Sequence, residues 1–373
     1  MSMECTPHAV VYERVQAGLS VVDFGARGDG RTDDTAAFLQ GVAAAAEQGL
    51  PLQIPAGEFR LTQTLELPGI TLCGIPGAQS PALLIDHVDG PGLRPISGAV
   101  TDLCLRYPGD HTGTQPAILL SAAGCRVSRV HIANAYDGIL FADEGPSNPG
   151  RSNVHEVTMV GIRHCGMRVT NTYDVACLRH IIINGDATFR EEGVGFLFGK
   201  NDDVRVSDCT VNGAAVGFSF TDLPAGDDQG ETFSTWGSFS ACRAVDTGCG
   251  IHIRSHFPSL RMAPLLFHHC DFDARLHALD VRPCGINISL YDCRLTARQG
   301  AALHVLGAHD LLCNHCRIGS EEGDGVWLSG GRHLLFHNNH ICAAGESIHV
   351  EAPPLGLLVA ENTEETFPKE VRS

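Results

Sequence analysis

The chain has 373 residues, and 43 Asp and Glu against 26 Lys and Arg give it a net charge of −17. Such an acidic chain is not a general binder of nucleic acid or of anionic membranes. No run of about 18 apolar residues predicts a membrane span, and the N-terminal stretch MSMECTPHAVVYERV lacks the basic and apolar segments of a signal peptide. We therefore expect synthesis in the cytoplasm, a reducing environment that keeps most of the 15 cysteines as thiols.

After an N-terminal arm (residues 1–18), the sequence predicts a strand at 19–24, a glycine-rich turn and then a helix. Asp33, Asp34 and Thr35 supply capping groups for this helix, which spans about 33–48 and ends at Gly49. The stretch PLQIPAGEFRLTQTLEL then alternates as short strands do. Interpretations of GARGDGRTDD as a phosphate loop or an Arg-Gly-Asp adhesion motif are weak, because a Gly-Lys-Ser/Thr ending is missing and short strings arise by chance.

The segment VVDFGARGDGRTDDTAAF, followed by IPAGEFRL, resembles the N-terminal signature of the pectate-lyase superfamily of right-handed parallel β-helix proteins. That group includes phage tailspikes and bacterial polysaccharide lyases, hydrolases and epimerases. The signature covers about residues 19–62, and the preceding YERVQAGLS resembles the connector found there in phage tail proteins. The resemblance implies a β-helix whose first coil is covered by the 33–48 helix. A phage-derived member would reside in the virion tail or be released by lysis, and it could form a homotrimer.

A fixed period supports the same fold independently. One position recurs every 23 residues, at Cys270, Cys293, Cys316, Asn339 and Asn362, and continues backwards more loosely through Cys242, Cys209, Ile181, Val157 and Val130. Two apolar positions precede it by five and three residues, as Val204 and Val206 precede Cys209. Short alternating strands at such a period indicate a solenoid with one coil per repeat. We predict an all-β fold, a right-handed single-stranded parallel β-helix of about eleven coils over residues 19–365, with a short tail at 366–373.

The recurring cysteines are expected to pack as small buried hydrophobes rather than to form disulfides or bind metal. The string Cys313-Asn314-His315-Cys316 looks like a redox or zinc pair, but both cysteines fall on inward columns, which favours core packing. The sequence indicates no cofactor, and a calcium ion is compatible with it without being indicated by any ligand pattern.

A second column marks where the first strand of each coil opens with a small residue, as in Gly250-Ile251, Ala278-Leu279 and Ala302-Leu303. Strand alternation then gives the outward residues, which are Leu140, Arg168, Leu197, Ser219, His252, Asp280, His304, Trp327 and His349. Two residues further on lies a neighbouring outward column of Thr170, Thr221, Arg254, Arg282, Ser329 and Glu351. Insertions at 107–115, 142–152, 186–192 and 221–235 fall at turns and are expected to gather on one face.

These columns predict a candidate active site around Asp280, His252 and His304, with Arg254 and Arg282 beside them. In β-elimination on a uronate polymer the arginines would neutralise the substrate carboxylate, and a histidine would remove the adjacent proton. Trp327 offers a flat face for a sugar ring, and Arg168, His349 and Glu351 extend the binding surface. The alternative that these are solvated surface residues stays open, because an outward strand face must be polar.

Hydrolysis needs two carboxylates, and the row supplies only Asp280. Partners would come from the insertions, which carry Asp227, Asp228 and Glu231 in one loop, and Glu191 or Glu192 in another. Polygalacturonase-like motifs are matched only poorly by Asn171-Thr172-Tyr173-Asp174 and by Asp202-Asp203, and the Asp-Pro-His motif of alginate epimerases is missing. We expect a polysaccharide or oligosaccharide as partner, with no nucleic acid and no membrane. A lyase ranks above a glycoside hydrolase, and a non-catalytic carbohydrate-binding or structural tail protein is the remaining alternative.

Overall fold

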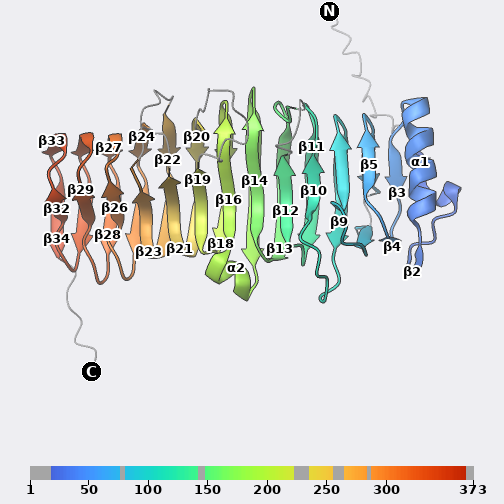
Figure 1. Ribbon diagram of the computed structural model, residues 1–373, viewed down its shortest axis with the longest axis horizontal. Coiled ribbons are helices and arrows are strands. Elements are labelled where there is room, and N and C mark those ends of the chain that lie inside the picture. Colours follow the sequence, from blue (N-terminus) through green and yellow to red (C-terminus); the bar gives the residue numbers. More distant parts are fainter. Residues whose placement is uncertain are drawn as a thin grey trace, which may run out of the picture.

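The computed structural model describes residues 18–75, 80–141, 148–221, 235–254, 264–283 and 287–366. They form a right-handed parallel β-helix of about twelve turns, one more than the sequence predicts. Figure 1 shows the turns stacked along one axis, with the single long helix at the N-terminal end. The fold prediction is therefore confirmed.

Each turn contributes strands to three parallel sheets. The first sheet contains β5 (Leu65–Pro68), β8 (Leu93–Ile96), β10 (Pro116–Leu120), β12 (Asp137–Phe141), β14 (Cys165–Thr172), β16 (Val194–Asn201), β19 (Val216–Thr221), the ends of β21 (Arg243–Arg254) and β23 (Asp271–Val281), β26 (Leu303–Leu306), β29 (Val326–Ser329) and β32 (Ile348–Ala352). This is the sheet whose outward residues were read from the small opening residues.

The second sheet contains β1 (Leu19–Ser20), β3 (Leu52–Ile54), β6 (Thr71–Gly74), the first halves of β9 (Ala99–Arg106), β11 (Arg126–Ala133), β13 (Asn153–Ile162) and β15 (Ala176–Gly185), and then β17 (Val204–Ser207), β20 (Gly237–Ser240), β22 (Leu265–His268), β24 (Ile288–Tyr291), β27 (His309–Asn314), β30 (Arg332–His337) and β33 (Leu355–Ala360). The third sheet contains β2 (Asp29–Asp33), β4 (Glu58–Leu61), β7 (Ala82–Ile85), the second halves of β9, β11, β13 and β15, β18 (Thr210–Asn212), the starts of β21 and β23, β25 (Arg294–Ala297), β28 (Arg317–Ser320), β31 (His340–Ala343) and β34 (Thr363–Thr366).

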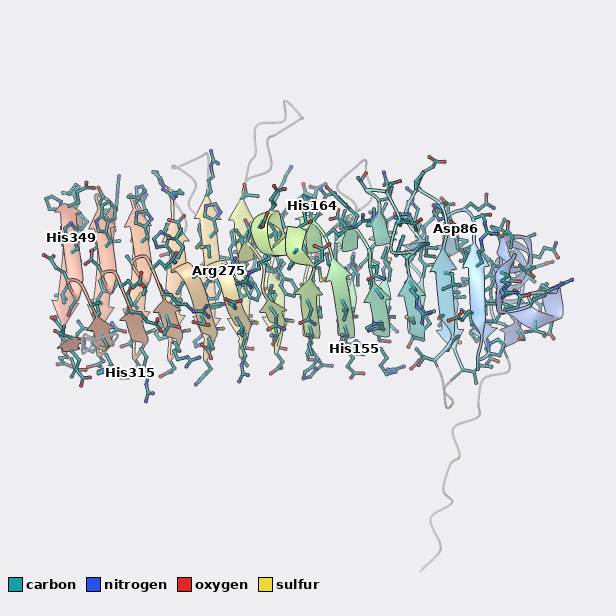
Figure 2. All side chains as sticks on the ribbon, turned by 90° about the horizontal axis from the view of Figure 1, so that it is seen from below. Asp86, His155, His164, Arg275, His315 and His349 are labelled. Carbon is teal, nitrogen blue, oxygen red and sulfur yellow. The ribbon has the colours of Figure 1, made fainter. Side chains whose placement is uncertain are left out.

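The bend between the second and third sheets is made by one residue per turn in the left-handed backbone region. These residues are Asp102, Arg129, Glu156, His180, Asp208, Ala241, His269, Asp292, His315, Asn338 and Glu361. From Arg129 onwards each stands directly before a residue of the recurring column, so the period read from the sequence marks this bend. Figure 2 shows His155 and His315 along this edge and His164 and His349 along the opposite one.

The recurring column lies in the interior, as predicted. Cys270, Cys293 and Cys316 are at most 2% exposed, and their thiols donate to backbone carbonyls of neighbouring turns. Contact with the neighbouring thiol of Cys270 and burial raise the pKa of Cys293 to about 12, which makes it unreactive. In the next turn Asn339 replaces cysteine; its Oδ1 accepts from the Cys316 N–H at 2.9 Å and its Nδ2 donates to the Cys313 carbonyl at 3.0 Å.

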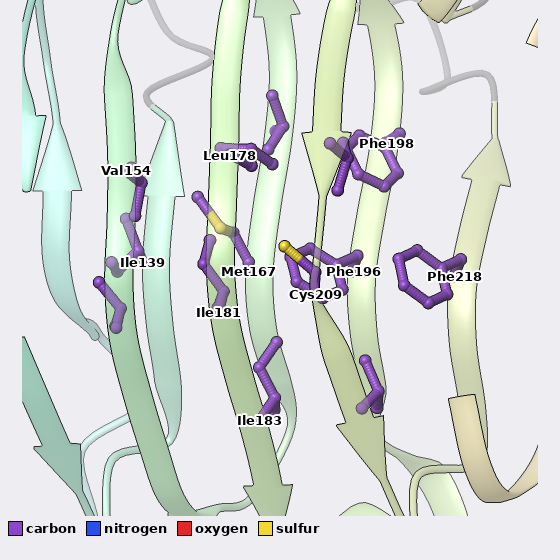
Figure 3. Packing of buried hydrophobic residues seen from close by; sticks show 14 of the residues in the cluster. Ile139, Val154, Met167, Leu178, Ile181, Ile183, Phe196, Phe198, Cys209 and Phe218 are labelled. Carbon is purple, nitrogen blue, oxygen red and sulfur yellow. The ribbon is translucent and has the colours of Figure 1, made fainter. Parts of the chain in front are cut away.

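Aromatic rings fill the middle of the core. Phe196 and Phe218 stack at 5.0 Å between ring centroids, and Phe198 and Phe220 stack at 5.1 Å one column away. Figure 3 shows Phe196, Phe198 and Phe218 beside the smaller aliphatic side chains of the preceding turns. Because each ring rests on the ring of the next turn, the stack joins turns that the backbone sheets already pair.

The N-terminal cap is α1 (Thr35–Gln48), which buries Phe38, Val42 and Ala45 against the first turn. The expected strand at 19–24 is shorter, because the 3-10 helix η1 (Val21–Phe24) follows β1. Asp34 does not cap α1 through its side chain. Its carboxylate instead accepts the backbone N–H groups of Arg27 and Gly28 at 2.7 and 3.1 Å, which fixes the glycine-rich turn against the cap.

Two of the four expected insertions lie within the described residues, and the other two fall largely outside them, at 142–147 and 222–234. Those at 107–115 and 186–192 precede a first-sheet strand, and those at 142–152 and 221–235 follow one. The insertion at 186–192 contains α2 (Ala187–Glu192), which is anchored by the buried Phe189. The insertions therefore interrupt the chain at both ends of first-sheet strands, whereas we expected them to gather on one face. Within the described residues, no helix is both long and apolar enough to cross a membrane.

Candidate active site

Five outward residues of the first sheet lie on five successive strands, in the order that the sequence predicts. The sheet register pairs them consecutively as His252, Asp280, His304, Trp327 and His349, from β21 to β32. Neighbouring strands are about 4.8 Å apart, so adjacent side chains are in contact distance. We call these five residues the His-Asp row.

Asp280 is the best-connected residue of the His-Asp row. Its Oδ1 accepts a hydrogen bond from Nδ1 of His304 at 2.7 Å, and its Oδ2 accepts one from Nε of Arg282 at 3.0 Å. Nε2 of His252 lies 3.7 Å from the same Oδ2, too far for a hydrogen bond. Because Nδ1 of His304 donates to Asp280, Nε2 of that ring is the nitrogen that can accept a proton.

The charge state of Asp280 follows from its partners. Burial raises the pKa of its carboxyl group, but the hydrogen bond from His304 and the charge of Arg282 outweigh burial and hold the pKa below the usual 3.8. Asp280 is therefore an anion at neutral pH. A general acid in glycoside hydrolysis needs a raised pKa, so Asp280 is unsuited to that role and suited to orienting a histidine base.

His252, on the other side of Asp280, is a neutral imidazole at neutral pH. Burial lowers its pKa, and the attraction of Asp280 offsets this only in part. A neutral imidazole is a hydrogen-bonding group or a weak base, not an acid. His252 is therefore better suited to hydrogen bonding with a substrate than to donating a proton as an imidazolium.

His277 belongs to the site but was missed from the sequence. Its ring stacks on His304 with centroids 4.7 Å apart, and its Nδ1 donates to the Ala301 carbonyl at 2.8 Å. It directly precedes the small residue Ala278, a position that the alternation assigned to no outward column. The register pairs it with Cys249, which precedes Gly250 in the same way. An alignment of the residues that directly precede the small opening residues could have identified His277 from the sequence.

Trp327 presents its edge rather than the flat face that the sequence predicts. The imidazole of His304 lies on one side of the indole, with centroids 4.8 Å apart, and that of His349 stacks on the other at 6.1 Å. Successive turns are so close that rings in one outward column cover one another. Trp327 thus forms an apolar wall beside His304. Nδ1 of His349 also forms a hydrogen bond with Oε2 of Glu346 at 3.1 Å.

The two arginines of the neighbouring column lie on adjacent turns. Arg254 is exposed. The side chain of Arg282 is 42% exposed and forms an ion pair with Asp280. The prediction for Glu351 in this column is wrong. The register shifts at the end of β32, so Ser329 pairs with Ala352, and Glu351 is an exposed residue displaced from the column.

Arg168 and Glu191, two of the other predicted binding residues, have no described contact with the His-Asp row. Arg168 is in the same column but three strands before His252, about 14 Å away. Glu191 is exposed on α2, and the structure gives no contact between it and Asp280. Its neighbour Arg190 binds Asp246, at the turn from the third to the first sheet. Asp227, Asp228 and Glu231 lie outside the described residues.

Metal binding at the site has no support in the side-chain arrangement. In the described ranges no three His, Cys, Asp or Glu side chains gather closely enough to hold a metal ion.

The family model for rhamnogalacturonase A/epimerase, pectate lyase-like proteins matches residues 18–224, more than half of the chain. The chain belongs to this family. The match ends before His252, so the family assignment covers the cap and the first part of the β-helix but not the His-Asp row.

A curated relative, the pre-neck appendage protein of Bacillus phage phi29, is 36% identical over 83 residues. The match spans 22% of this chain and 9% of that protein, so this chain covers less than a tenth of the relative's length. Two solved structures share the fold. The catalytic unit of a GH87 α-1,3-glucanase from Streptomyces thermodiastaticus gives a TM-score of 0.58 at 15% identity, over 94% of this chain and 70% of that one. A tailspike of Escherichia coli bacteriophage HK620, in complex with a hexasaccharide, gives 0.59 at 12% identity, over 91% and 64%.

Proposed function

We propose that this chain binds and cleaves an acidic polysaccharide by β-elimination at a uronate residue, as part of a phage tail or appendage. The observation that carries the proposal is the His304–Asp280 pair beside Arg282 and Arg254. A histidine base whose proton is fixed on Nδ1 and two guanidinium groups in one small area are what proton removal next to a carboxylate requires. The phage setting and the polysaccharide class are supported by the appendage relative and by the sugar-acting proteins that share the fold.

In the proposed reaction the substrate carboxylate binds to Arg254 and Arg282, which acidify the hydrogen on the neighbouring carbon. Nε2 of His304 takes that proton, and Asp280 stabilises the imidazolium that forms. The electron pair of the broken C–H bond becomes a carbon–carbon double bond as the glycosidic C–O bond breaks. The leaving oxygen takes a proton from water, and the hydroxide that forms takes the proton from the His304 imidazolium. One new unsaturated end and one hydroxyl result, and the neutral histidine is restored.

Hydrolysis at the same row is less well supported, because Asp280 is its one carboxylate and is held ionised. A protein that only binds sugar would need no base fixed in one tautomer. Both alternatives are outcomes of the same experiment, as is epimerisation, which begins with the same proton removal but leaves the chain intact.

The test compares the wild type with His304→Gln and with His333→Gln as a matched control. His333 also donates Nδ1 to an aspartate, Asp310, at 2.8 Å, but this pair is exposed and lies on the second sheet. Each protein is incubated with uronate-containing and neutral bacterial polysaccharides. Absorbance near 235 nm measures unsaturated ends, a reducing-end assay measures all cleavage, and hydrogen exchange from deuterated water measures proton removal without cleavage.

Elimination predicts unsaturated ends that appear with the wild type and the control and fall at least a hundredfold with His304→Gln. Reducing ends without new absorbance would replace the proposal with hydrolysis. Deuterium incorporation without cleavage would replace it with epimerisation. Binding with none of the three signals would leave a carbohydrate-binding protein and overturn the enzyme claim.

A further inference from the structure

A second surface feature lies on the edge between the first and second sheets, away from the His-Asp row. It is a hollow of about 590 Å³ lined by Arg151, Asp174, Val175, Asp202, Asp203 and Trp236. Arg151 precedes β13, Asp174, Val175, Asp202 and Asp203 come from the turns that follow β14 and β16, and Trp236 directly precedes β20. We call it the Trp236 hollow. Its Asp174 and Asp202-Asp203 belong to the two motifs that the proposed reaction does not use.

The floor of the hollow is held in place by a buried amide. Asn201 is fully buried; its Oδ1 accepts from the Thr172 hydroxyl at 2.9 Å, and its Nδ2 donates to the Val169 carbonyl at 2.7 Å and to the Thr235 hydroxyl at 2.9 Å. These contacts join three successive turns at the point where Asp202 and Trp236 emerge. The hollow is therefore a preformed feature of the solenoid edge.

The aspartates at the hollow differ in whether they are paired with an arginine. Asp174 pairs with Arg151 at 3.1 Å, and Asp203 pairs with Arg205 at 2.9 Å. Within the described ranges the carboxylate of Asp202 has no cationic partner. One acceptor is thus uncommitted, whereas hydrolysis would need two free carboxyl groups facing each other.

Trp236 differs from Trp327 in what surrounds its ring. Trp327 lies between two imidazoles, but no ring packs on Trp236 among the described residues. Its backbone is fixed, since its N–H donates to the Asn201 carbonyl at 3.3 Å and its carbonyl accepts from Val204 at 3.0 Å. An indole that lines a hollow on a rigid backbone offers an apolar face of the kind on which a sugar ring stacks.

We propose that the Trp236 hollow is a second sugar-binding site and that it takes a neutral or amino sugar without a carboxylate. The apolar face of the sugar ring rests on Trp236, and hydroxyl or ammonium groups donate to Asp202. A uronate is disfavoured because three aspartates and one arginine line the hollow, and that arginine, Arg151, is already paired with Asp174. That the ligand is a polysaccharide rests on the proposed function; the site itself stands on the hollow. It lies three strands before Asp280, about 14 Å along the axis, so one polymer can reach both.

The chain has only two tryptophans, and one lies at each site, so each site has its own fluorescent reporter. In the full-length Trp327→Phe variant, emission reports the Trp236 hollow alone. It is titrated with chitosan hexamer, maltohexaose and hexagalacturonate, as amino, neutral and acidic probes. Asp202→Asn is added to this background, with Asp292→Asn as a matched control on the opposite edge of the second sheet, where an exposed aspartate faces His269.

We expect saturable emission changes with chitosan hexamer and maltohexaose and at least tenfold weaker binding of hexagalacturonate. Asp202→Asn should weaken chitosan binding about tenfold, and Asp292→Asn should leave it unchanged. No saturable change with either uncharged or amino probe, or equal binding of hexagalacturonate, overturns the assignment. Loss of polymer cleavage in Asp202→Asn without loss of binding would make the hollow the reaction centre and also overturn it. Trp236 emission is read without turnover, so it supports or refutes the site even if no cleavage is found.

Discussion

Replacing Asp280 with asparagine tests the site most directly, because the change keeps the shape and removes one acceptor. The wild-type carboxylate serves two donors at once, Nδ1–H of His304 at 2.7 Å and Nε–H of Arg282 at 3.0 Å. An asparagine amide has one oxygen for these two donors. If the oxygen stays with Arg282, the amide N–H groups face His304 and force its proton onto Nε2. The histidine then loses the nitrogen that should accept the substrate proton.

The size of the effect follows from this geometry. A wrong tautomer and the loss of a carboxylate that stabilises the imidazolium reduce turnover by about 10²- to 10⁴-fold in comparable histidine–aspartate pairs. That corresponds to about 3–5 kcal/mol of transition-state stabilisation. The cost in folding is smaller, about 1–2 kcal/mol, because one donor loses its partner and Arg282, 42% exposed, can turn to water.

The assay is the steady-state rate of new absorbance at 235 nm on the uronate polymer that the wild type cleaves. We expect kcat to fall at least a hundredfold, with KM changed less than threefold, since the substrate carboxylate still meets both arginines. Asp310→Asn, at the exposed His333 pair, is the control and should retain full activity. Imidazole nitrogen shifts, assigned with the His304→Gln variant, should show the proton moving from Nδ1 to Nε2. A folded Asp280→Asn protein with more than half of the wild-type kcat would refute the role given to this pair.

Three further predictions concern stability and are read from urea unfolding. Phe218→Ala should lower the free energy of unfolding by about 3–5 kcal/mol, because removing a fully buried ring from the stack leaves a cavity. Leu197→Ala, on the outward face, should lower it by less than about 1.5 kcal/mol. Equal losses of stability in the two variants would contradict the role of the stack. Asn339→Ala should cost about 2–3 kcal/mol, since it leaves the Cys316 N–H and a carbonyl unpaired; a change within 0.5 kcal/mol would contradict the ladder contacts. Because the pKa of His252 is lowered in the folded protein, the unfolded chain takes up this proton first as the pH falls. The contribution of neutral His252 to the free energy of unfolding is therefore complete above the unfolded pKa of 6.5, and it is lost as the pH falls from there towards the folded pKa. His252→Gln should remove part of the decline between pH 7 and 5, and an unchanged pH profile would refute this assignment.

The fold could be predicted from the sequence because a solenoid repeats one local rule. From Arg129 onwards, each turn places a residue with left-handed backbone directly before the recurring column. A misassigned strand in one coil can therefore be recognised by comparison with the next coil. Departures arise where a single contact overrides the pattern. Asp34 has the sequence position of a helix cap, but its carboxylate binds the Arg27 and Gly28 amides, a long-range choice that no spacing rule contains.

The candidate site was only partly predictable for a related reason. The row His252, Asp280 and His304 follows from register, and the register repeats. The misplacement of Glu351 comes from one irregular pairing at the last turns, and a bulge leaves no mark in an alternating pattern. His277 was missed because alternation assigns it to no outward column, although the residue before each opening glycine or alanine is a column of its own.

The contrast between the two tryptophans follows from the same stacking that makes the His-Asp row. A side chain in a regular outward column has a neighbour about 4.8 Å away on both sides, which suits a relay of hydrogen bonds such as His304, Asp280 and Arg282. That spacing also covers the faces of any ring in the column, as it does for Trp327. Trp236 lies outside these outward columns, directly before β20, and no ring packs on it among the described residues. The proposals therefore divide the two roles, with proton chemistry on the first sheet and a sugar platform at its edge, and the His304→Gln assay and the Trp327→Phe titration test the two parts separately.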